Sequence, residues 1–175
     1  MPGPKREKRP SGAPSSASAE QANDALRKAL RFISYRLRSI EETIEKLKAI
    51  GFEAGVITDV VSRLSGAGYL DDERFARELA GSRIRNKHWG IKRIALDLRS
   101  KGIPDDIIRS ALSGVDASAE EQTAASALEK WIRKTGVKFP LEKKELEKAF
   151  RHLAGRGFPA HVVMGTLKKG GRPQE

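Results

Sequence analysis

The sequence GYLDDERFA at residues 68–76, followed by LRSKGIP at 98–104, decides the fold. Asp71 stands where a helix N-cap belongs, because two further acids follow it in the first turn, where unbonded amide protons and the helix dipole favour negative charge. With Asp71 as the N-cap, Leu70 and Phe75 occupy the two positions of a hydrophobic staple. The stretch therefore predicts a helix that starts at Asp71 and whose apolar face includes Phe75.

Two further helices complete this unit. One follows Gly90 and ends at Gly102, a residue free to take a positive φ, so that Leu98 and Ile103 make the apolar contact of a Schellman end. Pro104 is tolerated in a first turn but not in a helix interior, so the third helix begins there. Residues 69–115 are thus predicted to form a three-helix unit.

The same helix ending recurs along the chain. A leucine, a glycine four residues later and then a large apolar residue occur in three segments: 47–52, 98–103 and 153–158. Gly51, Gly102 and Gly157 are the stops of these segments, and Gly68 ends a further helix in the same way. Three units of this kind are each too small to bury their own apolar faces, which predicts stacking. The predicted fold is all-α: an elongated, curved tandem array of three three-helix repeats, at residues 24–68, 69–115 and 116–169.

The two ends of the chain differ from the repeats. Residues 1–23 are rich in Pro, Ser and Ala and carry a basic cluster, so they are predicted to form a disordered basic arm that buries too little apolar surface to offset the entropy of ordering. Residues 170–175 are predicted to form a flexible tail.

The residues that metal sites and nucleotide-binding sites require are missing from the sequence. The chain has no cysteine, its three histidines share no ligand spacing, and it carries no phosphate-binding glycine loop. The acids at 71–73 are explained by helix capping rather than by a metal site. We therefore expect no catalytic residue, no metal and no cofactor. With no apolar run of membrane-spanning length, we expect a cytoplasmic protein that does not bind membranes.

Positive charge is concentrated in the middle unit. The net charge is +11, and residues 77–101 hold eight Lys or Arg against two acids. At 3.6 residues per turn, Arg74, Arg77 and Arg85 fall within about a quarter of the helix circumference. These features predict a surface that binds an acidic partner, nucleic acid being the commonest. The candidate contact residues are Arg74, Arg77, Arg83, Arg85, Lys87, Lys92, Arg93, Arg99 and Lys101.

Two alternatives remain open for this surface. The charged faces can be merely solvated, and Trp89 can either pack beneath the turn or, with His88, stack against a base or an aliphatic partner.

The sequence resembles the RecX family of bacterial recombinase regulators. The resemblance covers about Ala25 to Lys169. It rests on the three-unit plan and on a set of matching residues in the middle unit. They are Gly68-Tyr69-Leu70-Asp71-Asp72, Arg74-Phe75-Ala76, Arg83, Gly90, Leu98 and Lys101-Gly102-Ile103. Of the matched positions, Asp71, Phe75, Leu98 and Gly102 are expected to build the unit, whereas the basic residues between them are the better candidates for contact.

The resemblance implies a non-enzymatic, monomeric protein that binds the RecA recombinase and lies along the groove of its filament on single-stranded DNA. It also implies the effects that the family has on that filament: limited growth and lower ATP hydrolysis, strand exchange and support of repressor self-cleavage. The single-stranded DNA is contacted either directly or through the filament.

A second function remains open from the residues themselves. A helix, a glycine turn and another helix also outline a helix-turn-helix DNA-binding transcription regulator. Such proteins usually carry one recognition helix per chain and dimerise, whereas this chain repeats the outline three times.

Overall fold

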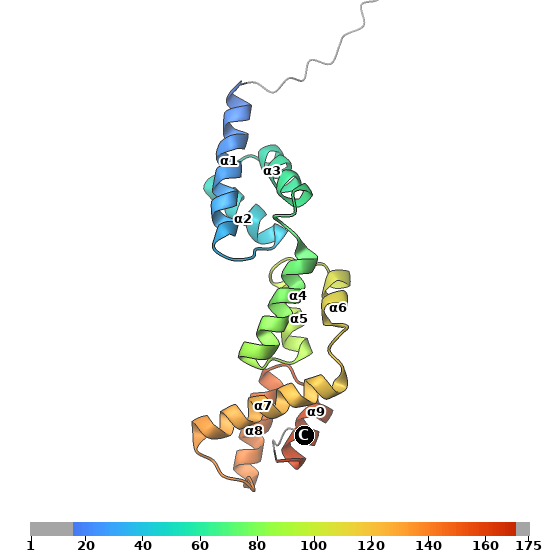
Figure 1. Ribbon diagram of the computed structural model, residues 1–175. Helices are drawn as coiled ribbons and strands as arrows, with labels where there is room; N and C mark the ends of the chain where they lie inside the picture. Colours follow the sequence, from blue (N-terminus) through green and yellow to red (C-terminus); the bar gives the residue numbers. More distant parts are fainter. Residues whose placement is uncertain (1–15, 171–175) are drawn as a thin grey trace, which may run out of the picture. The chain divides into compact units, whose positions relative to one another are not determined.

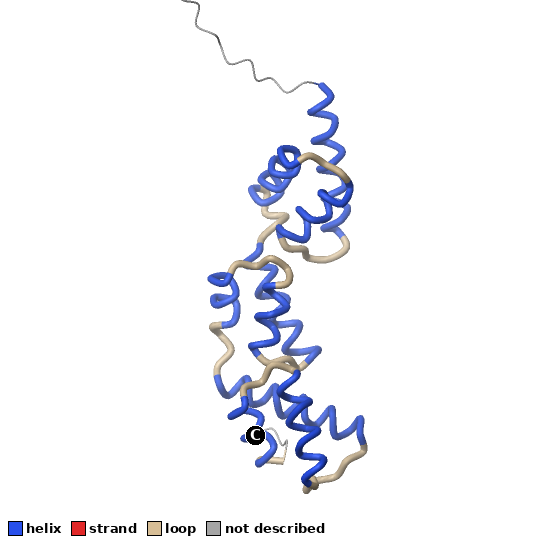
Figure 2. Tube along the Cα trace, turned by 180° about the vertical axis from the view of Figure 1, so that it is seen from behind, coloured by secondary structure: helices blue, strands red, loops and turns tan. Residues whose placement is uncertain are grey.

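The computed structural model describes residues 16–170, and within them the chain forms helices and no strand (Figures 1 and 2). The helical segments are α1 (Ser16–Ser34), α2 (Ile40–Ile50), α3 (Ala54–Gly66), α4 (Asp72–Ser82), the π-helical turn η1 (Arg83–Lys87), α5 (Ile91–Arg99), α6 (Asp105–Leu112), α7 (Ala117–Thr135), α8 (Lys143–Gly155) and α9 (Ala160–Lys168). The all-α prediction is confirmed.

The predicted N-terminal arm is wrong for residues 16–23, which form the first turns of α1. This segment, SASAEQAN, contains alanine, glutamate and glutamine, which have high helix propensity, and it continues a helix that is packed further along. The rest of the arm and residues 171–175 of the tail lie outside the described residues.

The chain divides into two compact units. The first contains residues 16–36 and 43–69, and the second contains 37–42 and everything described from Leu70 onward. In the first unit α1 packs against α3. Its core consists of Ala25, Ala29, Leu47, Ile57, Val60 and Leu64.

The second unit contains α4 to α9 around two apolar clusters. In one cluster α4 and α5 pack against α6, and in the other α7 and α8 pack against α9. The buried residues of the first cluster are Phe75, Ala76, Ala80, Ile94, Leu98, Ile103, Ile108 and Leu112. Those of the second are Ala124, Ala127, Leu128, Leu141, Ala149, Leu153, Phe158, Val162 and Val163. Both clusters belong to one compact unit.

The predicted start of α4 at Asp71 and the four predicted glycine stops are confirmed. The carboxylate of Asp71 accepts a hydrogen bond of 2.8 Å from the amide of Arg74, and both staple residues, Leu70 and Phe75, are buried. Each predicted glycine stop has a positive φ, and the amide after it bonds the carbonyl of the expected leucine. The φ values are 101° at Gly51, 73° at Gly68, 74° at Gly102 and 89° at Gly157. The corresponding bonds measure 3.3, 2.9, 3.2 and 3.4 Å.

The end of α4 differs from the prediction. The helix widens into η1, and the chain leaves it at His88, whose φ of 49° is left-handed. The amide of Trp89 consequently bonds the carbonyl of Arg83, six residues back. The expected ridge of Arg74, Arg77 and Arg85 assumed 3.6 residues per turn as far as residue 85, and this assumption fails once η1 begins.

Candidate partner-binding surface

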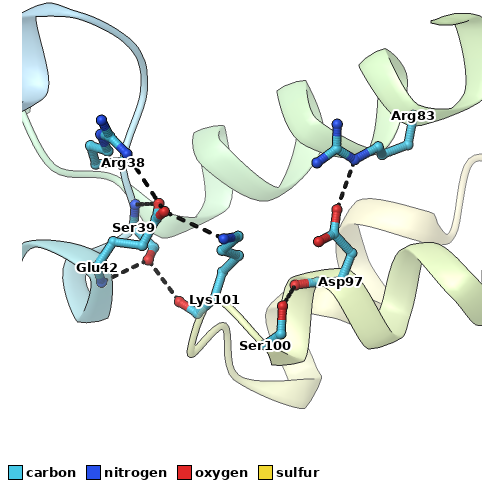
Figure 3. Close-up of polar contacts among 7 residues, drawn as sticks. All are labelled: Arg38, Ser39, Glu42, Arg83, Asp97, Ser100 and Lys101. Carbon is cyan, nitrogen blue, oxygen red and sulfur yellow. Dashed lines mark hydrogen bonds and ion pairs between the residues drawn. The ribbon is translucent and has the colours of Figure 1, made fainter. Parts of the chain in front are cut away.

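The start of α2 docks onto the turn between α5 and α6. Ser39 is the N-cap of α2, where it forms a capping box with Glu42: the Ser39 hydroxyl accepts from the Glu42 amide at 3.1 Å, and the Glu42 carboxylate accepts from the Ser39 amide at 3.3 Å. The same hydroxyl donates to the carbonyl of Lys101 at 2.7 Å (Figure 3). Lys101 also pairs with the Glu42 carboxylate at 3.6 Å. The cap of one helix therefore serves as a long-range contact as well.

Two more contacts complete this joint, which we define as the first joint. The amide of Ile40, the first residue of α2, donates to a carboxylate oxygen of Asp72 at 2.9 Å. The side chain of Glu41 lies against Gly102, where a Cβ atom would overlap it. Burial raises the pKa of Asp72, and the nearby Asp71 and Glu41 add to this effect, although the bond from Ile40 opposes it. Asp72 thus contributes to a joint as well as to the first turn of its helix.

A second joint repeats this plan between α5 and the third repeat. The amide of Ile91, the first residue of α5, donates to the carboxylate of Glu120 on α7 at 3.2 Å. The preceding amide, that of Gly90, donates to the carbonyl of Arg156 at 2.8 Å. Gly157 meets the backbone and Cβ of Arg93, as Gly102 meets Glu41 in the first joint. In both joints the start of a second helix docks onto a carboxylate and a glycine turn of the following repeat.

The sequence did not identify these joints as contacts. Asp72 was explained by its own helix, and Glu120 was not singled out although it is almost completely buried. The available signal was the helix start at Gly90, which carries no side chain to cap α5 and therefore needs an acceptor from elsewhere. Spacing alone could not say which carboxylate supplies it.

Trp89 lies beside the second joint, where two arginines approach its ring. The guanidinium carbons of Arg83 and Arg93 are 5.1 and 4.4 Å from the ring centre, within cation–π range. Arg83 also donates to the carboxylate of Asp97 at 2.7 Å (Figure 3). Arg93 donates to the carbonyl of Gly155. The half-buried indole therefore has cationic partners of its own within the protein, which favours the packing alternative for Trp89.

An open groove of about 590 Å³ runs beside this tryptophan. Lys92 and Leu96 line one side, and Leu96 is 63% exposed. The opposite wall comes from Ala154, Gly155, Gly157 and Phe158 of the third repeat. The groove combines an exposed apolar side chain with positive charge, which suits a partner surface with the opposite charge.

The structure divides the nine predicted contact residues into two groups. The members of the first group have partners within the protein. Four of them form ion pairs: Arg77 with Glu73 at 3.4 Å, Arg83 with Asp97, Arg99 with Asp105 at 2.8 Å, and Lys101 with Glu42. The fifth, Arg93, donates to the carbonyl of Gly155 at the second joint. The second group makes no ion pair within the described part of the chain: Arg74, Arg85, Lys87 and Lys92. All four are exposed, so this second group is the better candidate for contact.

Comparison with known proteins identifies the family. The description "RecX, first three-helix domain" matches residues 25–64, and "RecX, second three-helix domain" matches residues 71–112. "Regulatory protein RecX" of Prosthecochloris aestuarii is 34% identical over 150 residues, which are 86% of this chain and 95% of that protein. The chain belongs to the RecX family.

Other RecX proteins differ in length and sequence. "Regulatory protein RecX" of Bacillus licheniformis is 31% identical over 86% of this chain, which spans only 56% of that relative. The crystal structure of RecX from Lactobacillus salivarius has a TM-score of 0.74, with 22% identity over 86% of this chain and 97% of the other. At this identity the likeness shows the shared RecX fold. The relatives from Prosthecochloris aestuarii and Bacillus licheniformis are regulatory proteins by name.

Within the described residues the chain offers neither a membrane-spanning helix nor a cluster of metal ligands. Between residues 16 and 170, no helix is both long and apolar enough to cross a membrane. In the same range, no group of three or more His, Asp or Glu side chains is placed to hold a metal ion.

Proposed function

We propose that this RecX-family chain is a non-enzymatic cytoplasmic regulator that binds RecA and its filament on single-stranded DNA as a monomer. Bound there, it limits filament growth and inhibits ATP hydrolysis, strand exchange and the co-protease activity. The observation that supports this most directly is the group of exposed, unpaired cations on the second repeat, Arg74, Arg85, Lys87 and Lys92. A filament that carries nucleic acid offers such cations the acidic surface they lack within the protein.

The joints favour this proposal over a sequence-specific DNA reader. A recognition helix presents its N-terminal residues to base edges in the major groove. In α5 the first amide is bonded to Glu120, and Gly90 is buried against the third repeat. The corresponding end of α2 is bonded to Asp72. In both repeats the helix before the glycine turn is therefore docked onto the next repeat. The helix after the turn at Gly102, α6, carries Asp105 and Asp106 in its first turn, and their negative charge opposes entry into a groove lined by phosphates.

The decisive experiment is RecA-catalysed ATP hydrolysis on single-stranded DNA, with this protein added at a low ratio and then near equimolar. We expect inhibition, and inhibition at the low ratio indicates that filament ends are capped. The variant Arg85→Glu/Lys92→Glu should inhibit at least tenfold less well, because it reverses two exposed cations of the second group.

The matched control is Lys144→Glu/Lys148→Glu, which makes the same charge change at exposed positions of α8. It should inhibit like the wild type. The absence of inhibition at either ratio refutes the regulatory proposal. A strong preference of the protein for one duplex sequence in a random library would instead support the transcription regulator.

A further inference from the structure

A hollow of about 670 Å³ lies between His88, at the end of η1, and the exposed side of α7. Its lining contains one acid, Glu129, against three exposed cations and one histidine. The lining residues are His88, Ser126, Glu129, Lys130, Arg133 and Lys134. None of the three cations forms an ion pair within the part of the chain that the structure describes. The hollow is therefore positively charged, and the protein itself supplies little to balance that charge.

The positive charges around the hollow repel one another and disfavour protonation of two nearby histidines. Burial lowers the pKa of His88, and the positive charges of Lys130 and Arg156 lower it further. Burial also lowers the pKa of His152, and Arg156 and Lys134 add to that effect. Positive charges from α7 and from the turn after α8 thus converge on two imidazoles. An anion in the hollow would relieve this repulsion.

The position of His88 adds an independent observation. It is the only residue other than glycine with a positive φ between residues 16 and 170. Residues other than glycine rarely adopt this conformation, although asparagine, aspartate and histidine do so more often than the rest, so the surrounding structure holds His88 in a conformation that glycine favours. Strained residues of this kind cluster at binding and active sites. The imidazole of His88 lines the hollow, where it can donate a hydrogen bond.

We propose that the hollow binds the phosphate groups of a single-stranded nucleic-acid backbone, with Lys130, Arg133 and Lys134 as the phosphate ligands and His88 as a hydrogen-bond donor. The inference deepens the proposed function and rests on it, because the RecA filament is what presents single-stranded DNA. It adds a contact on the third repeat, where the sequence predicted none. The spacing fits a repeating polyanion, since positions 130 and 134 lie about 6 Å apart along the helix axis, which is close to twice the spacing of about 3.4 Å per nucleotide of a stacked strand.

The test measures binding of fluorescein-labelled dT15 to the full chain by fluorescence anisotropy, without RecA, from 25 to 200 mM NaCl at pH 7.5. In Lys130→Glu/Lys134→Glu we expect at least tenfold weaker binding. Loss of two phosphate contacts should also reduce the slope of log K against log salt by about 1.4, at about 0.7 per phosphate on a single strand. Circular dichroism checks that the variant is folded.

Three results would overturn the proposal. The first is an unchanged salt slope in the folded variant, and the second is an equal loss in Lys144→Glu/Lys148→Glu, since that would mean that only overall charge matters. The third is equal competition by a polyglutamate peptide of 15 residues, which would assign the hollow to an acidic protein surface. Because RecA is absent, these results are independent of whether the chain inhibits RecA.

A pH arm tests His88 itself. The charged groups around it are Glu129, Lys130, Arg133 and Lys134 on α7 and Arg156 after α8. A bound phosphate favours the protonated imidazole, so binding takes up a proton and the affinity for dT15 should rise several-fold as the pH falls from 7.5 to 6.0. His88→Gln should flatten this rise. A variant that retains the full pH dependence would exclude His88 from the site.

Discussion

The second joint depends on a backbone approach that only glycine allows, which makes Gly90→Ala the most informative substitution. Gly90 has an ordinary extended backbone, with φ of −77°, so alanine causes no conformational strain there. A Cβ at this position would nevertheless lie 2.7 Å from the carbonyl carbon and oxygen of Gly157 and 2.8 Å from the amide nitrogen of Phe158. All three are backbone atoms, which cannot rotate away as a flexible side chain can. The joint has to open by roughly 0.8 Å to reach an ordinary carbon contact of about 3.5 Å.

The cost follows from three terms. Overpacking a close contact costs about 1–3 kcal/mol, and weakening the bond from the Gly90 amide to Arg156 costs about 0.5–1.5 kcal/mol. The reduced entropy of the unfolded chain returns about 0.4–1 kcal/mol. The net destabilisation is therefore about 2 kcal/mol, which lowers Tm by about 4–8 °C for a chain of this size.

Thermal and urea unfolding followed by circular dichroism measure this change, and hydrogen exchange of the residue-90 amide reports on the joint directly. The control is Gly155→Ala at the end of α8, where nothing lies within 4 Å of the added methyl group. This control should unfold at the wild-type temperature or slightly above it. If Gly90→Ala is as stable as Gly155→Ala and its amide remains protected, the close approach is not a constraint and the description of the second joint is wrong.

Three further predictions concern other contacts. Ser39→Ala removes both the cap of α2 and the bond to the Lys101 carbonyl, so it should cost about 1–3 kcal/mol in urea unfolding; a loss below 0.5 kcal/mol would contradict the dual role. A double-mutant cycle of Arg83→Ala and Asp97→Ala should give a coupling of about 1–2 kcal/mol, because the pair is only 25% and 18% exposed, whereas exposed pairs give under about 1 kcal/mol. His152 has a pKa below its ordinary value of 6.5, so the unfolded chain binds more protons and stability should fall as the pH drops below about 6.5. His152→Gln should reduce this fall in Tm between pH 7.5 and 5.5, and an unchanged pH dependence would contradict the assignment.

The local code of the chain was sufficient to predict the start of α4 and the glycine stops. The cap at Asp71 and the four glycine stops depend on neighbours within about five residues, so their geometry is readable from spacing. The π-helical turn was not predicted, because no residue type marks it. The prediction that Arg85 lies on one ridge with Arg74 and Arg77 was wrong for this reason, because it extended an ideal α-helix through the π-helical turn.

The candidate site divides in the same way. The sequence indicated where positive charge is concentrated, and the structure then separated the cations that have partners within the protein from those that form no ion pair within the described residues. The cations of the hollow, such as Lys130 and Lys134, were missed because each belongs to an ordinary solvated helix face. They became a candidate site only when His88, about forty residues earlier in the chain, was found beside them.

By itself, therefore, the sequence determined an all-helical chain with a repeated glycine stop and a basic middle segment, because capping, helix termination and charge are local properties. Only the tertiary structure decided that Asp72 and Glu120 bond the starts of α2 and α5, and that Arg83 and Arg93 approach one tryptophan ring. The bonds of Asp72 and Glu120 join residues about thirty positions apart in the chain, and their formation depends on how apolar surfaces pack. Packing is set by shape and volume across the whole unit, which local spacing does not encode.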